Sequence, residues 1–225
     1  MLRFAVILRQ ASFFVKTGGI RFENVGVLRL SRTCTPQRRA RIERVLAQRQ
    51  QDLTLALVNI HDPHNVSAIY RSCDAFGVAE VHLYYTDTPF PALGRKSSAS
   101  ARKWVESIRH KTLESLIAGL RAGGRQLLAT SCDVAARPLT DWDFTMPTAV
   151  IMGNEHRGVD KELAAHVDGE LYIPMYGMIR SFNVSVAAAV ILAEASRRRA
   201  QAGMYDRPGY TEAEYAERLG VWLEK

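Results

Sequence analysis

The chain has 225 residues, and 47% of them are apolar, which suits one α/β domain with terminal extensions. Its net charge of +7 makes polyanions candidate partners, and no apolar run is long enough to predict a membrane span. The three cysteines, Cys34, Cys73 and Cys132, are scattered without a Cys-x-x-Cys pair. This pattern argues against a disulfide framework or a zinc site and favours a reducing compartment, the cytoplasm.

Residues 1–34 form an N-terminal extension with an unusual share of the charge. They contain six basic residues and one acid, so the rest of the chain carries a net charge of only +2. A targeting segment is a weak interpretation, because Arg9 interrupts the apolar stretch. We expect an unstructured tail or a translation start assigned upstream of the true one.

Residues 35–52 are expected to hold a basic helix. Thr35 followed by Pro36 has the residue types of a helix N-cap and first helical position, and the helix is predicted over 36–50. Its arginines include Arg38, Arg39 and Arg41. They fit either a solvated surface helix or a helix that follows nucleic-acid phosphates.

Strands and helices are predicted to alternate from residue 53 to 203. The expected strands are 53–60, 78–85, 125–131, 148–153 and 170–175, and the expected helices are 64–76, 112–122, 160–166 and 181–202. The polar run 96–101 is expected to be an exposed loop. This alternation predicts a parallel sheet with helices on both faces. Residues 204–225 form a C-terminal extension, whose last helix opens at a capping box, Thr211 and Glu214.

Several common enzyme motifs are missing. The sequence has neither a dinucleotide-binding G-x-G-x-x-G after its first predicted strand nor a P-loop, and no G-x-S-x-G element. His61 and His64 form an H-x-x-H pair, but no third ligand is spaced to complete a metal site. We expect no metal.

Three polar clusters follow predicted strands, at the sheet edge where α/β proteins bind ligands. The first, 59–78, contains Asn65 and Arg71; the second, 150–159, contains Glu155; the third, 173–199, contains Ser181 and Asn183 at the start of an alanine-rich helix. Helix starts present free N–H groups to polar ligands.

Each cluster also has a purely structural interpretation. Arg71 fits a surface salt bridge, Glu155 a simple turn with Asn154 in a left-handed conformation, and the third cluster a well-capped core helix. Each cluster alone is weak to moderate evidence of function, and the three together at strand ends are much stronger.

The three clusters resemble motifs 1, 2 and 3 of the SpoU family in the SPOUT superfamily of RNA 2′-O-methyltransferases. The similarity extends from Pro36 to the C-terminus through IHDPHNVSAIYRSCDAFGV, GNEHRGV and IPMYGMIRSFNVSVAAAVILAEASRRR, and is strongest to the bacterial tRNA guanosine-18 2′-O-methyltransferase group. It implies an α/β knot fold with a deep C-terminal trefoil knot, a rare exception to unknotted topology. It also implies a homodimer that binds S-adenosylmethionine (SAM) in the knot.

The resemblance also assigns roles to residues. The catalytic set would be Asn65, Arg71, Glu155, Ser181 and Asn183; the cofactor contacts Thr130, Gly153, Ile173, Met178 and Phe182; and the RNA contacts Arg38, Arg39, Arg41 and Arg180. Arg71 would remove the proton from the ribose hydroxyl, yet arginine is effectively always protonated. We therefore expect Arg71 to position phosphate and ribose as much as to take up a proton.

The expected function is methyl transfer from SAM to the ribose of the D-loop guanosine-18 of tRNA. The alternatives are ribosomal RNA or another tRNA position, a catalytically silent RNA-binding protein, and a small-molecule α/β enzyme. Arg180, Phe182 and Tyr176 depart from the family pattern around the cofactor pocket. They leave the details of adenine packing open and add a positive charge near the RNA.

Overall fold

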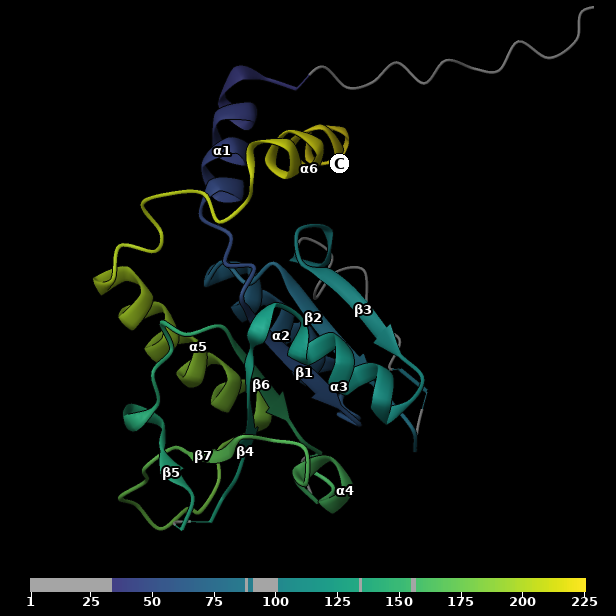
Figure 1. The fold of residues 1–225 in the computed structure, drawn as a ribbon, viewed down its shortest axis with the longest axis vertical. Helices are drawn as coiled ribbons and strands as arrows, with labels where there is room; N and C mark the ends of the chain where they lie inside the picture. The colour runs from purple at the N-terminus through teal and green to yellow at the C-terminus, as the bar shows by residue number, and fades with distance from the viewer. Residues whose placement is uncertain (1–33, 88, 91–100, 134, 155–156) are drawn as a thin grey trace, which may run out of the picture. The chain divides into compact units, whose positions relative to one another are not determined.

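Seven parallel strands form one sheet in the order β3-β2-β1-β6-β4-β7-β5 (Figure 1). The computed structural model describes residues 34–87, 89–90, 101–133, 135–154 and 157–225. The strands are β1 (Leu53–Val58), β2 (Glu80–Tyr84), β3 (Glu106–His110), β4 (Gln126–Thr130), β5 (Arg137–Pro138), β6 (Thr148–Met152) and β7 (Gly169–Tyr172). The N-terminal extension (except Cys34), most of the 96–101 loop and Glu155 lie outside the described residues.

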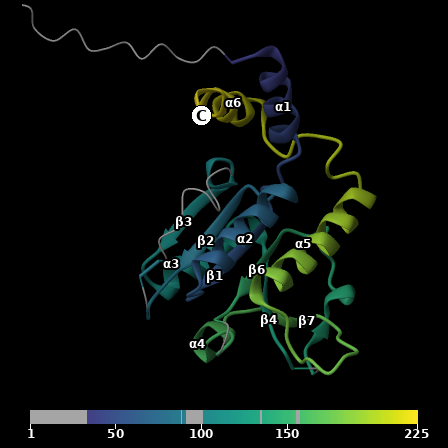
Figure 2. The same cartoon turned by 180° about the vertical axis from the view of Figure 1, so that it is seen from behind.

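Helices cover both faces of this sheet, as predicted (Figures 1 and 2). The helices are α1 (Pro36–Ala47), α2 (Pro63–Ala75), α3 (Leu113–Arg121), α4 (Lys161–Ala164), α5 (Val184–Gln201) and α6 (Glu212–Glu224), with 3-10 turns at Ala101–Lys103, Ala122–Gly124 and Leu139–Asp141. Helices α2 and α5 pack on one face, and α3 and α4 on the other. None of the helices in the described part of the chain has the length and apolar character needed to cross a membrane.

The apolar run at 53–60 forms the centre of the sheet. All six residues of β1 are buried. Leu55 and Leu57 belong to the core under α2 and α5, whereas Ala56 and Val58 belong to the core under α3. Both faces are covered, so the strand is apolar throughout instead of alternating. Burial of each leucine contributes about 1.5–3 kcal/mol relative to exposure.

Capping residues set where the helices begin. Asp62 caps α2 by accepting a hydrogen bond from the His64 N–H at 2.8 Å, with Pro63 at the first helical position. Asn183 caps α5 in the same way through the Ser185 N–H at 2.8 Å. The predicted helix 181–202 therefore begins at Val184, and Ser181 lies in the loop that precedes it.

Two strands were not predicted from the sequence. Strand β3 (Glu106–His110) is an edge strand of largely exposed residues, so it lacks an apolar run. Strand β5 has only two residues, at the opposite edge. Both strands are defined by pairing with a neighbour, β3 with β2 and β5 with β7.

Two fully buried arginines fix the segment between α1 and β1. This segment begins earlier than predicted, because α1 ends at Ala47 and not at residue 50. Arg49 forms an ion pair with Asp74 and donates to the Val78 carbonyl at 2.8 Å. Arg199, near the end of α5, pairs with Asp52 and donates to the Phe144 carbonyl at 2.8 Å. Removing one partner of a buried pair leaves an uncompensated charge, so these contacts hold the segment firmly in place.

Helices α1 and α6 pack together through a small apolar cluster next to this segment. Ile42 and Leu46 of α1 meet Trp222 of α6, and the Arg49 guanidinium lies 5.2 Å from the Trp222 ring centroid. The capping box predicted at the start of α6 is confirmed, with Thr211 and Glu214 bonded reciprocally.

Strand β7 lies between β4 and β5, which precede it in the chain. The chain thus returns and inserts a strand between two earlier, consecutive strands. This order is compatible with the threading that a knot requires, and the trefoil knot stays a prediction.

Candidate active site

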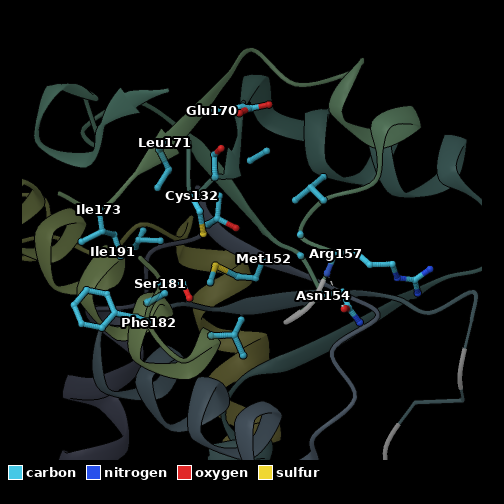
Figure 3. A pocket seen from close by; sticks show the side chains of 18 of the residues that line it. Cys132, Met152, Asn154, Arg157, Glu170, Leu171, Ile173, Ser181, Phe182 and Ile191 are labelled. Carbon is cyan, nitrogen blue, oxygen red and sulfur yellow. Dashed lines mark hydrogen bonds between the residues drawn. The ribbon is translucent and has the colours of Figure 1, made fainter. Parts of the chain in front are cut away.

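A cavity of about 720 Å³ lies at the carboxyl ends of β4, β6 and β7, beside the start of α5. Figure 3 shows side chains from these elements around it. Part of its lining consists of residues with roles predicted from the sequence. These are Thr130, Gly153, Ile173, Ser181, Phe182 and Asn183. The volume falls within the ~300–1,000 Å³ of small-molecule sites.

The turn after β6 forms one wall of the cavity. Asn154 and Gly158 exchange two backbone hydrogen bonds, both 2.9 Å long. A Cβ atom at position 153 would lie 2.3 Å from the carbonyl carbon and oxygen of Gly158, so only glycine fits there. The left-handed residue of this turn is Gly158, with φ of 69°; Asn154 does not have a positive φ, so the left-handed Asn154 of the structural interpretation is wrong.

The opposite wall is joined to α2 through two asparagines. The Asn183 side chain donates from Nδ2 to Oδ1 of Asn65 at 3.0 Å, while its own Oδ1 accepts from Ser185 as the cap of α5. Asn65 is buried and Asn183 is exposed. This contact brings together residues of the first and third sequence clusters, 118 positions apart.

Sequence reasoning missed Asn59 and Asn154. Asn154 is buried, and its Nδ2 donates to the Asn59 carbonyl at 2.9 Å and approaches His61 Nδ1 at 3.0 Å. Asn59 itself has φ of 49° and receives the Thr86 N–H on its side chain at 2.9 Å. The signal available in the sequence was an asparagine directly after a buried strand, a residue type that tolerates the left-handed conformation.

Two charged side chains border the cavity among the described residues. Arg157 extends away from its centre (Figure 3) and forms an exposed ion pair with Asp87. The Arg157 guanidinium holds the pKa of the Asp87 carboxyl below its ordinary value. The second charged side chain at the border of the cavity is Glu170 of β7. The remaining described lining is neutral, which suits a ligand without a large net charge.

Asn65, Arg71 and Met178 are not among the described residues that line this cavity. Arg71 lies on α2, six residues after Asn65, which is about 9 Å along the helix and about 120° around it. It is exposed and forms no hydrogen bond or ion pair with the described residues. Met178 is 99% exposed and does not line the cavity. Their predicted roles stay predictions, as does that of Glu155, which lies outside the described residues.

The predicted RNA-binding arginines are all exposed. Arg38, Arg39 and Arg41 lie on α1, and Arg180 lies in the loop before α5. Arg39 is paired with Glu43 on the next turn of α1, with a nitrogen–oxygen distance of 2.7 Å. Most of the positive charge on α1 is therefore available to an anionic partner.

A parallel α/β sheet with a cavity at its carboxyl edge is the arrangement of α/β ligand-binding proteins. Comparison with known proteins gives the family. Residues 52–193 match the model of the SpoU rRNA methylase family. The tRNA (guanosine(18)-2'-O)-methyltransferase of Thermus thermophilus is 47% identical over 191 residues, which cover 85% of this chain and 98% of that protein. The chain belongs to the SpoU methylase family.

Two solved structures share this fold. The Aquifex aeolicus TrmH/SpoU tRNA modifying enzyme is 35% identical with a TM-score of 0.77, covering 83% of this chain and 95% of that one. The SpoU methyltransferase AviRb of Streptomyces viridochromogenes, solved in complex with the cofactor AdoMet, is 26% identical with a TM-score of 0.55. That match covers 67% of this chain and 59% of AviRb.

Proposed function

We propose that this protein is a tRNA (guanosine-18-2′-O)-methyltransferase that uses SAM as its methyl donor. The observation that carries the proposal is the similarity to the Thermus enzyme over 98% of that protein's length. The cavity supports it independently, because residues of the second and third sequence clusters line it at the ligand-binding edge of the sheet. Asn183 of this lining is hydrogen-bonded to Asn65 of the first cluster.

The lining fits SAM. Met152, Ile173 and Ile191 offer apolar surface to a flat adenine, while Thr130 and Ser181 supply polar groups. Gly153 allows the Gly158 backbone to pack closely against it in the turn that forms one wall of the cavity, because its position has no side chain. When bound, SAM supplies a methyl group activated on a sulfonium. Thr130, Gly153, Ile173 and Phe182 are the proposed cofactor contacts, and Met178 is proposed on resemblance alone.

The chain's own catalytic task is to hold the ribose hydroxyl and manage its proton. Asn65 and Asn183, hydrogen-bonded to each other, orient the start of α5, and Ser181 lies beside them at the cavity. Arg71 is proposed to grip the neighbouring phosphate with its guanidinium and to steer the hydroxyl. Glu155 completes the proposed set by resemblance. Orientation of this kind supplies a large share of such acceleration.

The tRNA surface is proposed to include α1 and the loop before α5. Arg38, Arg39, Arg41 and Arg180 are exposed cations suited to phosphates. RNA helices are recognised mainly by shape and backbone, so we expect these arginines to act without reading bases. The domain organisation follows: 1–34 as an extension, 35–52 and 204–225 as RNA-binding ends, and 53–203 as the methyltransferase domain.

A homodimer is proposed from exposed apolar side chains around the cavity. Tyr176, Met178 and Ile179 are 98%, 99% and 60% exposed, and Phe182 and Val186 continue the patch onto α5. Apolar patches of this kind mark interaction surfaces. A second copy of the chain placed on this surface would complete the active site, and Arg71 would then approach it from a neighbouring subunit.

The proposed compartment is the cytoplasm, and no metal is proposed.

The test is incubation with labelled SAM and unmodified tRNA transcripts, followed by digestion to nucleosides. We expect labelled 2′-O-methylguanosine, lost in a transcript without the D-loop guanosine. Label in another nucleoside would move the target, and label only in ribosomal RNA would contradict the tRNA assignment. No transfer to any RNA, with SAM still bound, would favour a catalytically silent RNA-binding protein.

A further inference from the structure

We propose that Asn154 is a positioning residue for methyl-donor binding, because its side-chain amide fixes the cavity wall formed by Gly153 and Gly158. The inference rests on the proposed use of SAM. It concerns a side chain outside the predicted catalytic set and gives it a role in cofactor affinity.

The orientation of the Asn154 amide is fixed by its partners. Oδ1 accepts the Arg157 N–H at 3.2 Å, so Nδ2 faces the Asn59 carbonyl at 2.9 Å and His61 Nδ1 at 3.0 Å. An amide nitrogen only donates, and therefore His61 Nδ1 accepts. One buried amide thus joins the turn after β6 to the end of β1.

The cavity wall formed by Gly153 and Gly158 is tightly packed and has no room to shift. Asn154 is paired with Gly158 through two backbone hydrogen bonds of 2.9 Å, and the position of a Cβ on Gly153 would lie 2.3 Å from Gly158. Gly153, Asn154 and Gly158 all line the cavity. A shift of Asn154 therefore moves the surface against which the methyl donor is proposed to lie.

The other end of the connection is equally constrained. Asn59 is 2% exposed and is the one non-glycine residue with a positive φ in the described part of the chain. Its backbone N–H donates to the Tyr84 carbonyl at 3.1 Å, and its side chain bonds Thr86 at 3.0 Å and 2.9 Å. Asn59 therefore holds the left-handed conformation that asparagine tolerates, and its hydrogen bonds keep the carbonyl that Asn154 contacts in a fixed position.

A second connection runs in parallel and is weaker. Arg157 pairs with Asp87, three residues beyond the end of β2, but both side chains are more than one third exposed. Solvent and salt screen such pairs. The buried amide of Asn154 therefore carries the positional constraint, and Arg157 only supplements it.

The experiment compares SAM binding by calorimetry in the full-length protein and in Asn154→Ala and Asn154→Asp. Alanine removes the three side-chain hydrogen bonds described above. Aspartate keeps the acceptor for Arg157 but turns an oxygen toward the Asn59 carbonyl, which cannot donate. We expect Kd for SAM to rise about tenfold in both variants, which corresponds to about 1.4 kcal/mol. KM for SAM should rise in step, while kcat at saturating SAM and KM for tRNA stay within about twofold.

Gln126→Ala is the matched control. Its side-chain amide also donates twice, to the Asp143 carbonyl at 2.8 Å and to Thr148 Oγ1 at 2.9 Å, but at the amino end of β4, away from the cavity. It should lower the unfolding temperature without changing Kd for SAM.

The outcomes separate the two proposals. Unchanged Kd in both Asn154 variants, or a weakening matched by Gln126→Ala, would overturn the positioning role. Weakening in Asn154→Asp alone would assign the effect to the added charge and also overturn it. If the unaltered protein did not bind SAM, the proposed function would be overturned together with the positioning role that rests on it.

Discussion

At the residue scale, Gly153 and Asn59 meet opposite demands directly after the neighbouring strands β6 and β1. Gly153 has no room for a side chain because the Gly158 backbone occupies that space. Asn59 needs its side chain, which holds the end of β2 while its backbone adopts φ of 49°. Function at this edge therefore depends on backbone placement as much as on chemically reactive groups.

Gly153→Ala should destabilise the protein by about 1–3 kcal/mol, because the added methyl group meets backbone that cannot rotate away. SAM binding should be abolished or strongly weakened in parallel. Thermal unfolding and calorimetry measure both effects. The control is Gly220→Ala in α6, where a Cβ meets nothing within 4 Å and a helix-favouring residue should add about 0.5–1 kcal/mol. Equal behaviour of the two variants would contradict the packing argument.

Arg71→Lys keeps the positive charge but loses the planar fork that grips phosphate. We expect kcat to fall about 100-fold or more, with Kd for SAM unchanged because Arg71 does not line the cavity. Single-turnover methyl transfer to a tRNA transcript is the measurement. Near-full turnover of the lysine variant would remove both the positioning and the proton-transfer role from this residue.

At the element scale, the elements that could be predicted from the sequence are those determined by residues close together in the chain. The buried run of β1 and the capped start of α6 are each recognisable from a few adjacent residues. Strand β3 is not recognisable in this way, because an exposed edge strand is defined by its pairing with the neighbouring strand β2. The candidate site divides in the same way. Ser181 and Asn183 stood out as a helix start, whereas the Asn154–Asn59 contact joins residues 95 positions apart and needs the fold to be seen.

A histidine pair between β2 and β3 predicts a pH dependence of stability. His82 Nδ1 and His110 Nε2 are 2.8 Å apart. Burial, and then the neighbouring His82, lower the pKa of His110 below its ordinary 6.5. The unfolded chain therefore takes up this proton first, so stability is full above about pH 6.5 and falls as the pH drops below it. Groups facing the pair include Glu80 and, through it, Arg125.

His110→Gln should flatten that fall. Between pH 7.5 and 5.5, urea unfolding of the unaltered protein should lose more stability than that of the variant, by up to about 1.4 kcal/mol per pH unit for one group. Parallel curves for the two proteins would show that the pair does not couple protonation to folding.

From the exposed arginines of α1 we predict that RNA binding depends on salt concentration. Replacement of Arg38, Arg39 and Arg41 with alanine should weaken tRNA binding and flatten its dependence on salt, by about 0.7–0.9 in the logarithmic slope for each phosphate that α1 no longer neutralises. Kd for SAM should not change. Lys161→Ala, an exposed cation on α4, serves as the control and should affect neither. Equal weakening of tRNA and SAM binding would mean that α1 is structural.

At the scale of the whole molecule, the apolar patch beside the cavity predicts assembly. Ile179→Asp should convert the proposed dimer to monomer, because a carboxylate buried between two copies is costly. Sedimentation equilibrium measures this, and methyl transfer should fall with it. Val221→Asp places the same charge on α6, at a residue 52% exposed against 60% for Ile179. A dimer that survives Ile179→Asp, or dissociates equally in Val221→Asp, would contradict this interface.

The two buried arginines beside the α1–β1 segment have a consequence for substrate choice. Arg49 and Arg199 fasten this segment from both sides, and Arg49 also contacts Trp222 of α6. We therefore expect helix α1 to be held as a fixed part of the protein and not as a tethered arm. An RNA held on α1 would reach the cavity only if its target ribose lay at one set distance from the phosphates that α1 grips. The protein would then select a nucleotide by its distance from the bound phosphates in the folded RNA, before it contacts the base itself.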